Sequence, residues 1–156
     1  MFRPLALTAV SMLLAIGTSA RAAIGPPVVT LQATGMLTPA LGRSRMSDLE
    51  AVGAVRDALA RHCSSKGRPA LPDARDLSRG LVKSVALAAD ADSVRDRSVP
   101  SDRRAQYFFY AVPDPTSLPP LVASMAEGAR SAGVAATFRR TPSHPDGTYW
   151  VALALR

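Results

Sequence analysis

The chain has 156 residues, 47% of them hydrophobic, and 19 Lys and Arg against 12 acidic residues give it a formal charge of +7. This length is typical of a single domain, and the lone cysteine, Cys63, excludes an intrachain disulfide, so the fold must rest on its core. The basic excess suits contact with anionic walls, lipid surfaces or polysaccharide; the alternative is that it serves only solubility.

The first 22 residues have the pattern of a secretory signal peptide. Arg3 precedes an uncharged run, PLALTAVSMLLAIGTSA, and Ala20-Arg21-Ala22 fits the small-x-small cleavage pattern. The alternative, a membrane anchor, needs about 20 uninterrupted apolar residues. We therefore expect cleavage after Ala22, a secreted or periplasmic protein, no transmembrane segment after cleavage, and no nucleic-acid partner.

Residues 23–45 are expected to form a flexible N-terminal lead, because they hold tandem prolines and several Gly and Thr. Within this lead, β-propensity allows a short strand in VVTLQAT. Residues 46–156 are expected to form one α+β domain.

A first helix is expected from Ser47, because SDLE is a capping box in which Ser47 and Glu50 cap each other's main chain. Its apolar face follows at spacings of three and four, with Leu49, Val52, Val55 or Arg56, Leu59 and Cys63. Cys63 is expected either to be buried or to pair with another chain through an intermolecular disulfide. The adjacent His62 points about 100° away on a helix, so adjacency does not make a catalytic dyad.

A second helix is expected after the break at SSKGRPALP, with Asp73 as its N-cap. Its apolar face comprises Leu77, Leu81, Val85 and Ala88. The other face carries a basic stripe, Arg75, Arg79 and Lys83, interpreted as solvated surface, with a binding groove as the alternative. Asp90 and Asp92 lie where this helix ends and are expected to be solvated rather than to form a carboxylate pair.

A strand is predicted at AQYFFYAVP, where four consecutive aromatic residues at 107–110 indicate burial on both sides. The alternative is an aromatic cluster that stacks a ligand. A third helix follows from Pro119-Pro120, with Leu121, Val122, Met125 and Ala129 on its apolar face and Gly133 as its closing glycine. Asp114, between two prolines, is interpreted as a turn residue.

The chain nearly ends with two alternating runs, about 134–140 and 148–155, joined by a loop of seven residues, so an antiparallel hairpin is expected. Ser143, His144 and Asp146 lie together on that loop. A catalytic triad needs members that converge from different elements, so the loop is interpreted as a turn and Trp150 as a packing residue. This mixed order of elements predicts an α+β fold with a small antiparallel sheet packed between helices.

The sequence assigns no catalytic, cofactor-binding or metal residue. It lacks the Gly-x-Ser-x-Gly, His-Glu-x-x-His, phosphate-loop and Cys-x-x-Cys patterns. Zinc would need three or four clustered ligands, and the chain has only two histidines, His62 and His144.

A resemblance to a known family emerges from both ends of the domain. EAVGAVRDALARHC followed by GRPALPDARDLSRGLVKSVALAAD resembles the opening of a CAP domain, the superfamily of cysteine-rich secretory proteins, antigen 5 and pathogenesis-related proteins. Arg56 stands at the helix arginine, Pro69 and Leu71 in the loop, and Leu77 at the second helix. SAGVAATFRRTPSHPDGTYWVALALR is similar to the closing hairpin of that superfamily. The resemblance implies an α-β-α sandwich.

The superfamily's cavity uses two histidines and two glutamates, and none of the corresponding residue types here, His62, His144, Glu50 and Glu127, sits in a family motif. The family helix Asn is also missing, with Gly53 or a neighbour in its place. The resemblance therefore implies a degenerate exported member, a non-catalytic domain that binds a lipid, a cell-wall component or a protein partner. The alternatives are a structural or inhibitory partner protein of the cell envelope that pairs through Cys63, and a small secreted hydrolase.

Overall fold

The computed structural model describes residues 28–31, 45–94, 99 and 102–156. The predicted signal peptide, and the lead apart from residues 28–31 and 45, lie outside these residues. The described elements are β1 (Val28–Thr30), α1 (Asp48–Ser65), α2 (Arg75–Asp90), β2 (Gln106–Val112), α3 (Pro120–Ala126), β3 (Ala132–Thr141) and β4 (His144–Leu155). Helices and strands therefore mix as an α+β fold requires, and no helix in the described ranges is long and apolar enough to cross a membrane.

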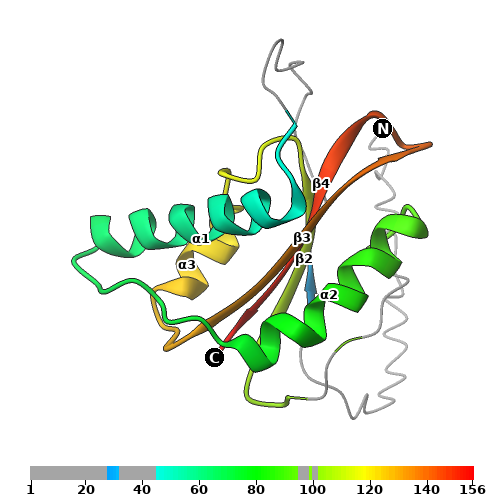
Figure 1. Cartoon of the computed structure of the whole chain (residues 1–156). Helices are drawn as coiled ribbons and strands as arrows, with labels where there is room; N and C mark the ends of the chain where they lie inside the picture. The colour runs from blue at the N-terminus through cyan, green and yellow to red at the C-terminus, as the bar shows by residue number, and fades with distance from the viewer. Residues whose placement is uncertain (1–27, 32–44, 95–98, 100–101) are drawn as a thin grey trace, which may run out of the picture.

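The four described strands form one sheet in the order β1-β2-β4-β3 (Figure 1). β4 pairs antiparallel with both β2 and β3, whereas β1 pairs parallel with β2, in the register Val28↔Tyr107 to Thr30↔Phe109. The prediction of a purely antiparallel sheet is therefore wrong for the β1–β2 pair, and the sheet is mixed. The chain passes through α1 and α2 between β1 and β2, and such a long crossover connection permits parallel pairing.

The helices cover both faces of the sheet (Figure 1). α1 and α3 pack on one face against alternate strand residues that include Phe108, Tyr110 and Val151. α2 packs on the other face against Tyr107, Phe109, Trp150 and their neighbours. The prediction that β2 is buried on both sides is confirmed, as is Trp150 as a packing residue, 3% exposed.

The first helix begins as predicted, but one residue of its expected apolar face is exposed. The capping box is complete, with the Glu50 amide bonded to the Ser47 hydroxyl and the Glu50 carboxylate bonded to the Ser47 amide. Leu49 is 82% exposed, which corrects its predicted burial. Asp48, in the same turn, bonds to β3, the outermost of the described strands, and none of these strands lies beyond this turn to bury Leu49.

α2 buries Leu77, Leu81, Val85 and Ala88 as predicted. Its N-cap is Ala74 rather than Asp73, and no side chain caps the helix. The Asp73 carboxylate instead accepts hydrogen bonds from Arg56 and Ser78, so these side chains hold the start of α2 against α1.

α3 ends at Ala126, and Gly133 does not close it. Gly133 lies in β3, where it packs against the first turn of α2. A Cβ at this position would lie 2.6 Å from the Leu77 Cβ and 2.8 Å from the Ser78 amide nitrogen. Glycine is therefore needed here because β3 approaches α2 closely. The position of Gly133 in the sequence after α3 gives no sign of this contact.

β3 and β4 are longer than expected, and the connecting loop is much shorter. Thr141 pairs with His144, so only Pro142 and Ser143 lie between the strands, and the seven-residue loop is wrong. Pro145 is tolerated because β2 pairs with β4 only from Tyr149 onward, which leaves the start of β4 with a single neighbouring strand. Gly147 has φ +90° and lies beside the Phe138 ring.

Candidate functional site

The end of the sheet holds a cluster of Ser143, His144 and Asp92. The Ser143 amide donates a 2.8 Å hydrogen bond to Asp92 Oδ2, and the Ser143 hydroxyl donates to the same oxygen. His144 Nδ1 lies 3.6 Å from Asp92 Oδ1 and 3.4 Å from the Thr141 hydroxyl. The structure therefore brings together Ser143 and His144 from the predicted loop, but it joins them to Asp92 from the end of α2.

Asp92 is not the solvated helix-end residue that was expected, since its side chain is only 16% exposed. It follows α2 in the left-handed region, with φ 49°, and there its carboxylate lies against the β3–β4 turn. Sequence reasoning missed this contact because Asp92 and Ser143 are 51 positions apart. An acid just beyond a helix end carries no local signal of such a partner.

The cluster is suited to holding the turn rather than to nucleophilic catalysis. Burial raises the pKa of the Asp92 carboxyl, but hydrogen bonds from Ser143 and Thr141 and the nearby His144 outweigh it and lower the pKa to about 2. A carboxylate this acidic is a very weak base for a serine hydroxyl. The Ser143 hydroxyl is bonded to the carboxylate rather than to an imidazole nitrogen, as a triad would require, and Asp146 is exposed.

The family-type cavity residues do not converge in the described structure. His62 Nε2 lies 3.0 Å from Glu127 Oε1, which links the end of α1 to the end of α3. Glu50 is engaged with Ser47 in the capping box, and His144 lies near Asp92. Among the described residues, no group of three or more His, Cys, Asp or Glu could hold a metal ion.

The thiol of Cys63 is buried near the end of α1, with the residue 1% exposed. A disulfide with another chain would require this end of α1 to open. The intermolecular disulfide through Cys63 therefore stays a prediction, and it could form only in molecules in which the end of α1 has unfolded locally.

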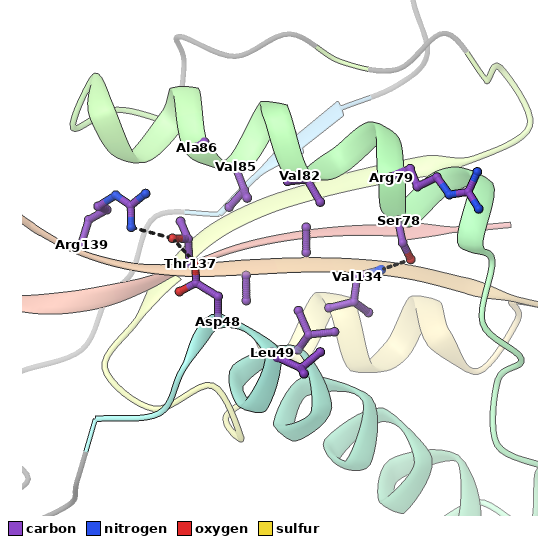
Figure 2. A pocket seen from close by; sticks show the side chains of 13 residues that line it. Asp48, Leu49, Ser78, Arg79, Val82, Val85, Ala86, Val134, Thr137 and Arg139 are labelled. Atoms are coloured by element: carbon purple, nitrogen blue, oxygen red, sulfur yellow. Dashed lines mark hydrogen bonds between the residues drawn. The ribbon is translucent and has the colours of Figure 1, made fainter.

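A groove of about 440 Å³ lies along β3, between the first turns of α1 and the outer side of α2 (Figure 2). Its lining comprises Asp48, Leu49, Val52, Ser78, Arg79, Val82, Val85, Ala86, Val134, Ala135, Ala136, Thr137 and Arg139. Of the predicted basic stripe, Arg79 lines this groove while Arg75 and Lys83 do not. In the sequence, this groove was indicated only by the alternative interpretation of the basic stripe as part of a binding groove. Nothing in the sequence indicated that α1 packs beside β3.

Two wall residues expose unusually large apolar surfaces. Leu49 of α1 is 82% exposed and Val82 of α2 is 60% exposed. In Figure 2, Val82 and Val85 project from α2 on one side of β3, and Leu49 projects from α1 on the other. The groove therefore has an apolar wall on each side of the sheet edge.

The floor of the groove is the outer edge of β3. Three of its polar groups are bonded to the helices. The Val134 amide donates to the Ser78 hydroxyl at 3.1 Å, and the Phe138 amide donates to Asp48 Oδ1 at 3.1 Å. The Thr137 hydroxyl donates to Asp48 Oδ2 at 2.9 Å.

Ala136 lies between these two bonded amides. In an antiparallel pair, alternate residues of an edge strand direct both main-chain groups away from the partner strand. Since the Val134 and Phe138 amides bond away from β4, the N–H and C=O of Ala136 face the same way, into the groove. No described residue is a partner for either group.

No protein-family model, curated protein or solved structure matches the chain. The described residues form an α+β domain with an apolar groove along its edge strand.

Proposed function

We propose that the protein is an exported, non-catalytic binding domain of CAP-like fold, and that its binding site is the groove beside β3. The exposed apolar walls at Leu49 and Val82, 82% and 60% exposed, carry this proposal. Contiguous apolar surface beside a groove is a feature of binding sites. The helices on both faces of the sheet and the antiparallel pairing of β3 with β4 support the CAP-like assignment.

Binding explains the described residues better than the two alternatives do. A secreted hydrolase would need a base for Ser143, and this hydroxyl is bonded to Asp92 instead. A partner protein that pairs through Cys63 would need an accessible thiol, and Cys63 is 1% exposed. The groove requires neither a nucleophile nor a change of structure.

The test uses the anionic apolar dye 1-anilinonaphthalene-8-sulfonate, whose fluorescence rises in apolar surroundings. We expect one saturable site on the full mature protein. The double variant Leu49→Gln/Val82→Gln should weaken dye binding at least about tenfold, since it removes apolar contact on both walls. Because both side chains are exposed, the variant should remain folded.

Leu121→Gln is the matched control, because Leu121 is 42% exposed on α3, outside the groove. It should leave dye affinity unchanged. Equal affinity in the wild type and the groove variant, or an equal loss in the Leu121 control, would exclude the groove as the binding site.

A further inference from the structure

We propose that the groove binds an extended peptide segment of a partner protein, which pairs with β3 as an additional strand. This proposal rests on the proposed function, because it names the ligand class of the same groove. The main-chain groups of Ala136, the two apolar walls and the charges at the ends of the groove each support it.

The floor of the groove favours a peptide over a lipid chain. An acyl chain seated on β3 would cover the N–H and C=O of Ala136 without offering a hydrogen bond to either, and buried main-chain groups without partners are strongly unfavourable. A peptide in extended conformation offers one acceptor and one donor at the required spacing. The groove therefore suits a ligand with its own main-chain amides.

The position of the added strand is limited on both sides. The Val134 amide is already bonded to Ser78 and the Phe138 amide to Asp48. Only Ala136 between them offers both an N–H and a C=O toward the groove. We infer that the ligand is short and that its central residue lies opposite Ala136.

The walls define which side chains the ligand carries. Successive side chains of a strand point to opposite faces of a sheet. Those on one side would contact Leu49 and Val52 of α1, and those on the other would contact Val82 and Val85 of α2. Because both walls are apolar, the ligand should carry about three consecutive apolar residues, as strands buried on both faces do.

Charges flank this apolar segment. Arg79, adjacent to Ser78, lies toward the Val134 end of the groove and has no ion pair with any described residue. Arg139 lies at the opposite end, where its Nε is 3.8 Å from Asp90 in a partly exposed pair. Acidic residues on either side of the apolar segment would complement these two arginines.

A second copy of the chain fits this edge less well than a single strand. α1 and α2 both pack against β3 itself, in the core clusters on opposite faces of the sheet. Two copies meeting edge to edge would bring these helices together before their β3 strands reach the spacing of about 4.8 Å that pairing requires. A lone peptide strand has no flanking helices.

The first stage of the test selects ligands from a phage-displayed library of random heptapeptides against the full mature protein. Phage that also bind Leu49→Gln/Val82→Gln are removed, and Leu121→Gln serves as the positive control. We expect sequences with about three consecutive apolar residues and acidic flanks. A synthetic copy of a selected peptide should displace the dye from the groove.

The second stage methylates each main-chain nitrogen of that peptide in turn. Since Ala136 offers a single C=O to the ligand, one main-chain nitrogen of the peptide donates to β3, and methylation should weaken binding at least about tenfold at that position and little at its neighbours. A uniform response along the peptide would overturn strand pairing.

Sodium laurate separates failure of this inference from failure of the proposed function. If laurate displaces the dye and no groove-dependent peptide is selected, the groove binds acyl chains and the peptide proposal is wrong. If dye, laurate and peptides all fail to bind, the proposed function fails as well. A dimer in sedimentation that Leu49→Gln/Val82→Gln dissociates would identify a second copy as the occupant and overturn the peptide proposal.

Discussion

The carboxylate of Asp48 in α1 accepts a 2.9 Å hydrogen bond from the hydroxyl of Thr137 in β3, which lies 89 positions further along the chain. The other oxygen accepts a 3.1 Å bond from the Phe138 amide. One side chain thus closes part of an exposed strand edge and defines one end of the groove. Native proteins commonly protect edge strands in such ways.

Asp48→Ala should lower the free energy of unfolding by about 1–3 kcal/mol, because the buried Thr137 hydroxyl and the Phe138 amide lose their acceptors. Urea denaturation measures the change. Asp57→Ala is the control, since Asp57 lies exposed on the same helix, and it should change stability by less than about 0.5 kcal/mol. Equal effects of the two variants would contradict a specific role for Asp48 at the edge.

Two glycine-to-alanine substitutions should have opposite signs. Gly133→Ala places a Cβ 2.8 Å from the Ser78 main-chain nitrogen, and the strand must shift from α2 at a cost of about 1–3 kcal/mol. Gly53→Ala in α1 meets no atom within 4 Å and should stabilise the protein by about 0.5–1 kcal/mol through helix propensity. Thermal unfolding of both variants checks the prediction, which fails if Gly133→Ala is neutral or stabilising.

Asp92→Asn should destabilise the protein at neutral pH by about 1 kcal/mol, because a neutral amide accepts weaker hydrogen bonds from Ser143 than a carboxylate does. Asn keeps the preference for the left-handed backbone at this position, so the comparison isolates the charge.

The effect of Asp92→Asn should depend on pH. The pKa of Asp92 is lowered to about 2 in the folded protein, against about 3.9 in an unfolded chain. The stabilisation is therefore present above about pH 4 and is lost as the pH falls toward 2. Melting temperatures of both proteins should converge over that interval. Asp146→Asn, at an exposed position near the start of β4, is the control for removal of a surface carboxylate and should change stability by less than about 0.5 kcal/mol at neutral pH.

The form recovered outside the cytoplasm should begin at Ala23, because Ala20-Arg21-Ala22 fits the signal-peptide cleavage pattern. Intact mass measurement of the protein from a periplasmic or culture fraction tests this expectation. Ala20→Arg/Ala22→Arg should block processing by removing the small residues that the peptidase requires. A full-length wild-type chain of 16.4 kDa in that fraction would contradict cleavage.

Local chemistry in the chain predicted a substantial part of the fold. The Ser47–Glu50 capping box joins residues three positions apart, and the apolar face of α2 repeats every three or four residues. Both features can therefore be predicted from the sequence alone. The consecutive aromatic residues of β2 likewise predicted burial on both sides. These features depend on neighbours within a few residues.

The remaining features depend on residues far apart along the chain. Gly133 follows α3 at a spacing that suits the glycine that ends a helix. The residue must instead be glycine because a Cβ there would collide with the backbone of α2. In the sequence, Asp92 has the features of a solvated residue at a helix end, but in the structure the β3–β4 turn lies against its side chain. The parallel pairing of β1 and the placement of β3 at the sheet edge also have no local signal, because strand order depends on which surfaces pack together.

The groove shows most clearly which features local sequence predicts and which depend on tertiary packing. Periodicity identified α1, α2 and their apolar residues, and it assigned Leu49 to a buried face because amphipathic spacing records only which side of a helix a residue occupies. Whether that side meets a strand depends on where the sheet ends. Only the packing of both helices against the edge strand leaves Leu49 and Val82 exposed on either side of Ala136 and forms a binding site there.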